Sequence, residues 1–225
     1  MLRTPEPELM EDLEQVAAYA SADFSDADAL FIEQIAAHLP ADLPAHPRVA
    51  DLGCGPGGQT VKLAQAFPSW QIDAVDGATA MAAAARSRVT AAGLADRVVV
   101  HEARLPDAVG EALPPRSYDL VVSSSLLHHL PEGRTLWNSG SQLLRTGGVL
   151  VVLDLTRPPS EGAARDLVQR VAGDADPILQ ADFYHSLRAA WRPDEIAQQL
   201  GESDLRDASV AQVSERHLLV VARAG

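Results

Sequence analysis

The sequence has only one cysteine, Cys54, among its 225 residues, which excludes an intramolecular disulfide. We interpret Cys54 as a small buried side chain rather than a reactive thiol. No stretch approaches the roughly 18 uninterrupted apolar residues of a transmembrane helix. The acidic, proline-containing start does not resemble a signal peptide, so we expect a cytoplasmic protein. Because 47% of the residues are hydrophobic, the chain can still bury a sizeable core as one domain, with or without a modest lid.

Positive charge is also scarce. There are 18 Lys and Arg against 31 Asp and Glu, a net charge of −13. Binding nucleic-acid phosphates needs a basic surface, so a nucleic-acid partner is disfavoured. The acidic balance is compatible with a cationic ligand, although solubility alone would explain it. Nothing indicates a membrane partner, and the oligomeric state stays open.

Two further patterns are missing. The histidines show no spacing with cysteines or carboxylates that is typical of zinc, so the sequence predicts no metal site. This applies to His101, His128, His129 and His185. Ser123 to Ser125 lack the G-x-S-x-G pattern of a hydrolase nucleophile. Metal-dependent and serine-hydrolase chemistry are therefore not indicated.

What the sequence does contain is an alternation of short apolar segments and helical segments. Such an alternation predicts a parallel sheet wrapped by helices. We expect strands at 48–52, 70–76, 97–101, 118–123 and 148–153, and helices at 58–67, 79–92, 132–145 and within 160–200.

The two ends of the chain differ from this pattern. Residues 1–10 look loose, 11–38 read as one or two helices, and the proline-rich stretch 40–47 is a connector. Glu8, Glu11, Asp12 and Glu14 are interpreted as a solvated helix face. The β-rich segments 207–214 and 216–223 are too close together for a parallel crossover, so they must form an antiparallel hairpin. The predicted fold is a doubly wound α/β, mostly parallel seven-stranded sheet with this hairpin at its C-terminal end.

The most informative stretch is 49–58, Val-Ala-Asp-Leu-Gly-Cys-Gly-Pro-Gly-Gly. A strand runs into a turn that is almost free of side chains, and a helix follows, with its N–H groups and positive dipole end directed at the turn. This predicts a cradle for a nucleotide-type cofactor. The glycines fit both G-x-G-x-x-G, the dinucleotide pattern, and G-x-G-x-G, which suits a ligand without a pyrophosphate.

Three nearby features favour the second pattern. Asp51 would repel a pyrophosphate but would help to hold an ammonium group. Pro56 removes a backbone N–H that a phosphate cradle would use. Asp76 ends the next strand, where a carboxylate can accept hydrogen bonds from both ribose hydroxyls.

Together, the strand, the glycine turn, the acidic end of the second strand and the terminal hairpin resemble the class I S-adenosylmethionine-dependent methyltransferases. The segments 118–130 (YDLVVSSSLLHHL) and 143–150 (LLRTGGVL) strengthen the resemblance, which covers 48–155 and 205–223. It implies S-adenosylmethionine as cofactor and methyl transfer to a small molecule by in-line displacement. We accordingly divide the chain into a helical cap and linker (1–47), a cofactor-binding core (48–155), a helical lid or acceptor region (156–200) and the hairpin (201–225).

The resemblance also implies cofactor contacts, position by position. The methionine part would be held by Asp51 and by the turn, the ribose by Asp76, and the adenine by residues after the second and third strands. Many family members have a Gly-Asp-Ala-type segment after the third strand, where this chain has Glu102 to Leu105. The implied set is Asp51, Gly53, Gly55, Gly57, Asp76, Gly77, Ala78, Met81, Arg104, Leu105, Ser123 and Ser124.

The acceptor side is less defined. Candidate catalytic residues are His128, Asp154 and Tyr184, and candidate substrate-binding residues are Tyr19, Arg157, Arg188 and His217. Each has a structural alternative: a histidine bonded to backbone, a loop cap, ordinary core or a solvated edge charge. Phe183, Leu187 and Trp191 share a helical face that is most simply core. The arginines 157, 188 and 216 faintly suggest an acceptor with a carboxylate.

Other functions stay open at this point. The chain could be an NAD(P)-dependent oxidoreductase, since G-x-G-x-x-G is present, although Asp51 and the terminal hairpin count against it. It could be a non-catalytic cofactor-binding partner subunit. It could also use the same cofactor for chemistry other than methyl donation.

Overall fold

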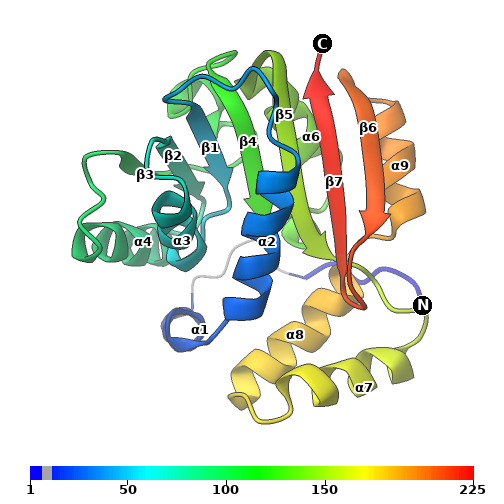
Figure 1. The fold of residues 1–225 in the computed structure, drawn as a ribbon. Coiled ribbons are helices and arrows are strands. Elements are labelled where there is room, and N and C mark those ends of the chain that lie inside the picture. The colour runs from blue at the N-terminus through cyan, green and yellow to red at the C-terminus, as the bar shows by residue number, and fades with distance from the viewer. Residues whose placement is uncertain (7–11) are drawn as a thin grey trace.

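The computed structural model describes residues 1–6 and 12–225, and within these residues one sheet has seven strands in the order β3-β2-β1-β4-β5-β7-β6 (Figure 1). The predicted helix face at Glu8 and Glu11 lies outside the described residues. The strands are β1 (Arg48–Leu52), β2 (Gln71–Asp76), β3 (Val98–Glu102), β4 (Tyr118–Ser124), β5 (Leu144–Leu155), β6 (Leu205–Gln212) and β7 (His217–Ala224).

The pairing of the strands confirms the predicted fold class. Strands β1 to β5 are parallel to one another, and β7 runs antiparallel to both β5 and β6. Two strands differ from their predicted bounds, because β6 spans Leu205–Gln212 and not 207–214, and β5 begins at Leu144 and not at residue 148. Leu144 already pairs with Tyr118, and Gly147 then turns the chain at a φ of 76° before regular pairing resumes at Val149.

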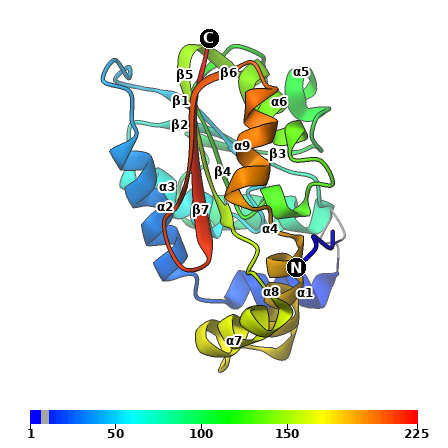
Figure 2. The ribbon, with the colours of Figure 1, turned by 90° about the vertical axis from the view of Figure 1, so that its right-hand side faces the viewer.

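Helices cover both faces of the sheet (Figure 2). On one face, Phe31 and Ile35 of α2 pack with Leu63 of α3 and with β-strand valines in a fully buried cluster. On the other face, Trp137 of α6 and Ile196 of α9 lie in the largest cluster. The helices at the sheet are α2 (Ser25–Ala37), α3 (Gly58–Ala66), α4 (Thr79–Ala91), α5 (Ala108–Glu111), the 3-10 turn η1 (Leu127–His129), α6 (Arg134–Leu143) and α9 (Pro193–Gly201).

A smaller group of helices lies beyond the carboxyl ends of the parallel strands (Figure 1). It consists of α1 (Leu13–Ser21), α7 (Glu161–Ala172) and α8 (Pro177–Ala189). Helices α7 and α8 pack on each other through Leu167 and Leu187. Of the segment predicted as a lid, 156–200, only these two helices lie here. The third, α9, covers the sheet because Ile196 and Leu200 are buried in the main core.

The described start of the chain is not loose, contrary to the prediction for residues 1–10. The guanidinium of Arg3 donates to the carbonyls of Ala189 (2.6 Å) and Leu130 (2.8 Å) and stacks on Trp191 at 3.9 Å. The backbone N–H of Thr4 donates to Arg188 O at 3.0 Å. A single arginine with several donors thus ties the segment 1–6 to α8 and to the loop after η1.

Among the helices of residues 1–6 and 12–225, none has both the length and the apolar character needed to cross a membrane.

Candidate active site

The glycine turn after β1 adopts a backbone that L side chains rarely accept. Gly53, Gly55 and Gly57 have φ values of 74°, 53° and 77°. A Cβ on Gly53 would lie 2.8 Å from the Leu126 side chain, and one on Gly57 would lie 2.8 Å from Ala85 Cα. A Cβ on Gly55 would meet no described atom within 4 Å. Packing therefore requires two of the glycines, and the third leaves an open face toward the cavity.

Asp76 is tied to this turn. Its Oδ2 accepts a hydrogen bond from Gly55 N–H at 2.8 Å, and its Oδ1 accepts one from Ala78 N–H at 2.9 Å. Burial raises the pKa of Asp76, and these two hydrogen bonds act against that rise. Each carboxylate oxygen keeps a lone pair for a ligand, so Asp76 is held ready to accept two hydroxyl groups.

Four predicted cofactor residues do not line the cavity: Asp51, Gly57, Ala78 and Ser123. The hydroxyl of Thr60 donates to Asp51 Oδ2 at 2.6 Å, and Asp51 is 4% exposed. Burial raises the pKa of Asp51 to about 6, the charge of Asp76 adds to this, and the Thr60 hydrogen bond opposes it. Ser123 is fully buried and donates to Leu52 O at 2.9 Å. Like Gly57, these residues support the turn; direct contact with a cofactor stays a prediction.

A large cavity opens between the turn, α1, α8 and β7, with a volume of about 1110 Å³. Ligand pockets typically measure about 300–1000 Å³, so there is room for a nucleotide-sized cofactor and an acceptor together. At its rim Tyr19 stacks on Phe24 with ring centroids 5.7 Å apart. The predicted site residues that line the cavity are Tyr19, Gly53, Gly55, Asp76, Gly77, Met81, Arg104, Leu105, Ser124, His128 and His217.

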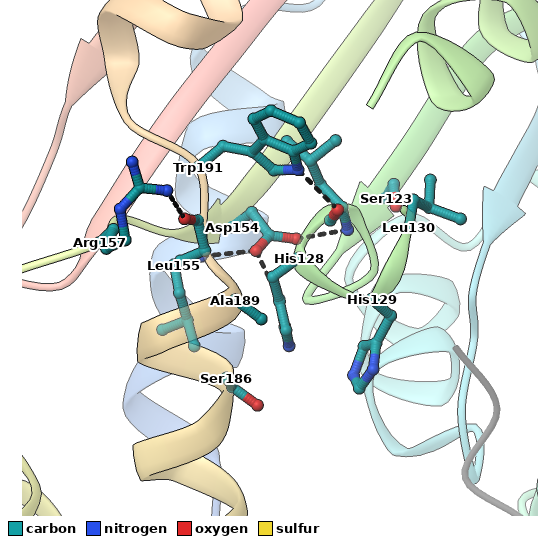
Figure 3. A network of polar contacts seen from close by, with 12 residues as sticks. Ser123, His128, His129, Leu130, Asp154, Leu155, Arg157, Ser186, Ala189 and Trp191 are labelled. Atoms are coloured by element: carbon teal, nitrogen blue, oxygen red, sulfur yellow. Dashed lines mark hydrogen bonds and ion pairs between the residues drawn. The ribbon is translucent and has the colours of Figure 1, made fainter. Parts of the chain in front are cut away.

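His128 is held by Asp154 at the end of β5 (Figure 3). Its Nδ1 lies 2.6 Å from Asp154 Oδ1, and Asp154 Oδ2 accepts from Leu127 N–H at 2.8 Å. Burial alone would lower the pKa of His128, but the charge and hydrogen bond of Asp154 more than offset this, so the pKa is raised. Because Asp154 is 1% exposed and lies behind His128, we reassign it from a catalytic residue to a positioning residue.

Three predicted acceptor-side residues do not line the cavity, so its geometry lends no support to their predicted roles. The Tyr184 ring contacts the guanidinium groups of Arg165 and Arg188, each 5.6 Å from its centroid. Arg188 also donates to the Thr4 hydroxyl at 3.3 Å. Arg157 is buried, donates to Ala190 O at 2.8 Å and pairs with Glu195. These contacts link α7, α8 and α9 to one another and to the start of the chain.

His217 does line the cavity, at the start of β7. Its Nδ1 lies 3.0 Å from the hydroxyl of Ser214. Burial, helped by the charge of Arg216, lowers the pKa of His217 to about 4. The cavity therefore receives a neutral imidazole here at physiological pH.

Sequence reasoning missed Glu6 and Ser186. Glu6 Oε1 lies 3.6 Å from His128 Nε2 and 3.5 Å from His129 Nδ1, and it accepts a hydrogen bond from the Ser186 hydroxyl at 3.0 Å. Burial raises the pKa of Glu6, and the charge of His128 acts against this. The fold joins residues too far apart in sequence to form a recognisable motif, and the sequence prediction of no metal site stays a prediction. The adjacent pair His128–His129 was the one sequence signal.

Comparison with known proteins agrees with this geometry. Residues 49–148 match a family model described as a methyltransferase domain. Trans-aconitate 2-methyltransferase of Methylobacterium radiotolerans is 38% identical over 122 residues, covering 52% of this chain and 42% of that protein. The 27-O-demethylrifamycin SV methyltransferase of Amycolatopsis mediterranei is 28% identical over 186 residues, covering 81% and 66%. The chain thus spans about half the length of the trans-aconitate relatives that it matches.

Solved structures share the whole fold. A SAM-dependent methyltransferase from Aquifex aeolicus has a TM-score of 0.70 at 17% identity, over 95% of this chain and 99% of that one. Phosphoethanolamine N-methyltransferase 2 of Haemonchus contortus, with S-adenosyl-L-methionine bound, has a TM-score of 0.66 at 16% identity, over 89% and 52%.

Fold and site define an α/β domain that binds a nucleotide-type cofactor at the switch point between β1 and β4. The family match identifies residues 49–148 further as a methyltransferase domain, and together with the shared fold it confirms the predicted resemblance to the class I S-adenosylmethionine-dependent methyltransferases.

Proposed function

We propose that this chain transfers a methyl group from S-adenosylmethionine to a small-molecule acceptor. The observation that carries the proposal is the bond between Asp76 and Gly55 N–H beside the open face of Gly55. The Asp76 carboxylate can accept hydrogen bonds from ribose hydroxyls, and next to it Gly55 exposes backbone with no side chain in the way. This combination fits a nucleoside cofactor without a phosphate.

The residues present fit that cofactor along its whole length. The methionine end would lie on the turn at Gly53 and Gly55, near the buried charge of Asp51. Asp76 would accept the ribose hydroxyls. Gly77, Met81 and the backbone at Arg104 and Leu105 would enclose the adenine, since all of them line the same cavity. The cofactor supplies an activated methyl group on a positively charged sulfur, so the protein has to supply mainly alignment.

The acceptor would occupy the end of the cavity lined by Tyr19, His128 and His217. Helices α1 and α8 flank this end, so it suits a small molecule better than a polymer. Of the three arginines that suggested a carboxylate acceptor, only Arg216 lines the cavity. We therefore leave the acceptor as a small molecule, and we retain a cytoplasmic location as a prediction.

Calorimetry with S-adenosylmethionine and S-adenosylhomocysteine tests the proposal. Both should bind the wild type, and Asp76→Ala should weaken binding at least tenfold, about 1.4 kcal/mol. Asp96→Ala is the matched control, because Asp96 is exposed in a turn away from the cavity and should leave the affinity unchanged. Stabilisation by NADH with no response to S-adenosylmethionine would support an oxidoreductase instead.

A further inference from the structure

A second chemical centre lies on the wall of the same cavity. Glu6, His128 and His129 each direct one ligand-type atom at the others, and these atoms all lie within 4.8 Å of one another. Figure 3 shows the His128 ring between His129 on one side and Ser186 of α8 on the other. The distances from Glu6 Oε1 to the two rings, 3.6 and 3.5 Å, exceed the about 2.7–3.2 Å of an N–H···O hydrogen bond.

These separations agree with shared coordination of an ion. In a tetrahedral zinc site, His nitrogens and carboxylate oxygens lie about 2.0–2.1 Å from the metal, so neighbouring ligand atoms are about 3.3–3.4 Å apart. The two distances from Glu6 Oε1 exceed this spacing only slightly. The ligand nitrogens of His128 and His129 lie within 4.8 Å of each other, and small side-chain rotations would bring them to the same spacing.

The ligand atoms are also oriented from behind. Asp154 bonds His128 Nδ1 at 2.6 Å, which leaves Nε2 as the atom presented to the cluster. Asp154 is itself fixed by the N–H groups of Leu127 and Leu155, each at 2.8 Å. The Ser186 hydroxyl fixes Glu6 Oε1 at 3.0 Å. Carboxylate-bound histidine and a hydrogen-bonded carboxylate are the outer-shell arrangements that metal ligands require.

Charge favours a cation here. The carboxylates of Glu6 and Asp154 lie on two sides of His128, and their negative charge outweighs the positive charge of Arg3, which donates to His128 O at 3.2 Å. Two imidazole nitrogens and one carboxylate oxygen form the donor set of open zinc sites, in which a fourth position is left for another ligand. Magnesium and calcium prefer donor sets of oxygen alone.

We propose that Glu6, His128 and His129 bind a divalent transition-metal ion of the zinc type. His128, His129 and Ser186 line the cavity, so the fourth coordination position faces it. An oxygen atom of the acceptor would occupy that position, and the metal would hold the acceptor in line with the methyl group. This last step rests on the proposed function, whereas binding of the metal does not.

Calorimetric titration of the chelator-treated protein with Zn²⁺ tests the site. We expect one tight site per chain, lost in His129→Ala and at least tenfold weaker in Glu6→Gln. Ser186→Ala should weaken binding by about tenfold, as removal of an outer-shell partner typically does. His46→Ala is the matched control, because His46 is exposed and lies outside the cluster. With Co²⁺, the wild type should show the intense visible absorption of a four-coordinate ion, and His129→Ala should not.

Equal Zn²⁺ affinity in the wild type and His129→Ala, or only the weak spectrum of six-coordinate Co²⁺, would overturn the proposal. S-adenosylhomocysteine affinity, measured on the same variants, reports whether each one is folded. Loss of Zn²⁺ binding with normal S-adenosylhomocysteine binding counts for the metal site. If the wild type binds S-adenosylhomocysteine but no Zn²⁺, the metal proposal alone fails. If it binds Zn²⁺ but no cofactor, the proposed methyl transfer alone fails.

Discussion

The carboxylate of Asp76 accepts the backbone N–H of Gly55 at 2.8 Å, so the group expected to receive the ribose also shapes the turn expected to receive the methionine. Asp76→Asn would disturb both roles at once. Each Asp76 oxygen accepts a backbone N–H, so the new amide NH₂ would face a donor in place of an acceptor. Asp76→Asn should therefore lower the affinity for S-adenosylhomocysteine at least tenfold and the free energy of unfolding by about 1–3 kcal/mol. Calorimetry and urea unfolding measure the two losses. A variant with lower stability but full affinity would remove Asp76 from the ribose site.

Asp51 gives a prediction with a defined pH dependence. Its pKa is about 6 in the folded protein against a usual 3.8, so the folded state retains a proton that the unfolded chain releases. The resulting stabilisation is present below pH 3.8 and is lost as the pH rises through 6. At neutral pH the ionised form costs up to about 3 kcal/mol, which Asp51→Asn would not incur.

We therefore expect Asp51→Asn to be more stable than the wild type at about pH 7.5 and nearly equal to it at about pH 4. Urea unfolding of both proteins at the two pH values measures the difference in stability between them. His217, whose lowered pKa makes stability rise with pH, contributes equally to both proteins and cancels from this difference. The same substitution should weaken S-adenosylmethionine binding. A stability difference that is the same at both pH values would contradict the buried, charged state of Asp51.

Gly53 and Gly55 should respond differently to alanine. In Gly53→Ala the new methyl would lie 2.8 Å from Leu126, so both packing and backbone strain oppose it, and we expect a clear loss of stability. In Gly55→Ala the methyl enters open space, so only backbone strain of about 1 kcal/mol applies, while the methyl occupies cofactor space. Thermal melting with and without S-adenosylhomocysteine distinguishes the two. If S-adenosylhomocysteine stabilises Gly55→Ala as much as the wild type, the ligand does not bind against the open face of Gly55.

Arg3 holds the start of the chain through several carbonyl groups and Trp191. Arg3→Ala should lower the free energy of unfolding by about 2–3 kcal/mol, because it leaves buried carbonyls without donors and removes a cation–π contact. Arg134→Ala is the control, since that side chain is 60% exposed and makes only long ion pairs. Chemical denaturation compares them. Equal losses in the two variants would refute the structural role of Arg3.

Tyr184 provides a prediction of no effect. Its ring packs between Arg165 and Arg188 away from the cavity, and phenylalanine retains that ring. Tyr184→Phe should change neither S-adenosylhomocysteine affinity nor, by more than about 0.5 kcal/mol, stability. Calorimetry and thermal melting test this. A tenfold weaker affinity would return Tyr184 to the candidate site.

That most of the predicted cofactor residues line one cavity could be predicted from sequence, because these residues are near neighbours along the chain or end adjacent strands. Gly53 and Gly55 follow β1, and Asp76 ends β2. These strands are parallel and adjacent, so their carboxyl ends lie at the same edge of the sheet. The fold class and the terminal hairpin follow from local patterns, whereas the order of the strands was not predicted. Two strands were misplaced: β5 starts earlier, since Leu144 pairs before a glycine turn, and β6 lies two residues earlier than predicted.

The acceptor side could not be predicted in the same way. Helical periodicity shows that Tyr184 and Phe183 point in different directions, but not which of them faces the cavity, and the structure places Phe183 there. Trp191 lies beyond the end of α8, which stops at Ala189, so its predicted helical face does not exist. Glu6 lies next to His128 only because the segment 1–6 is bonded to α8 and to the loop after η1, which no local sequence pattern indicates.

The missing side chain of Gly53 also affects the chemistry further along the cavity. Leu126 packs into the space that a Cβ would fill, and the next residue, Leu127, donates its N–H to the same carboxylate that holds His128. The proposed binding site of the methyl donor and the His128 imidazole are thus connected through directly packed and hydrogen-bonded residues. Donor and acceptor would be aligned already when the chain folds, with little left for either ligand to arrange on arrival.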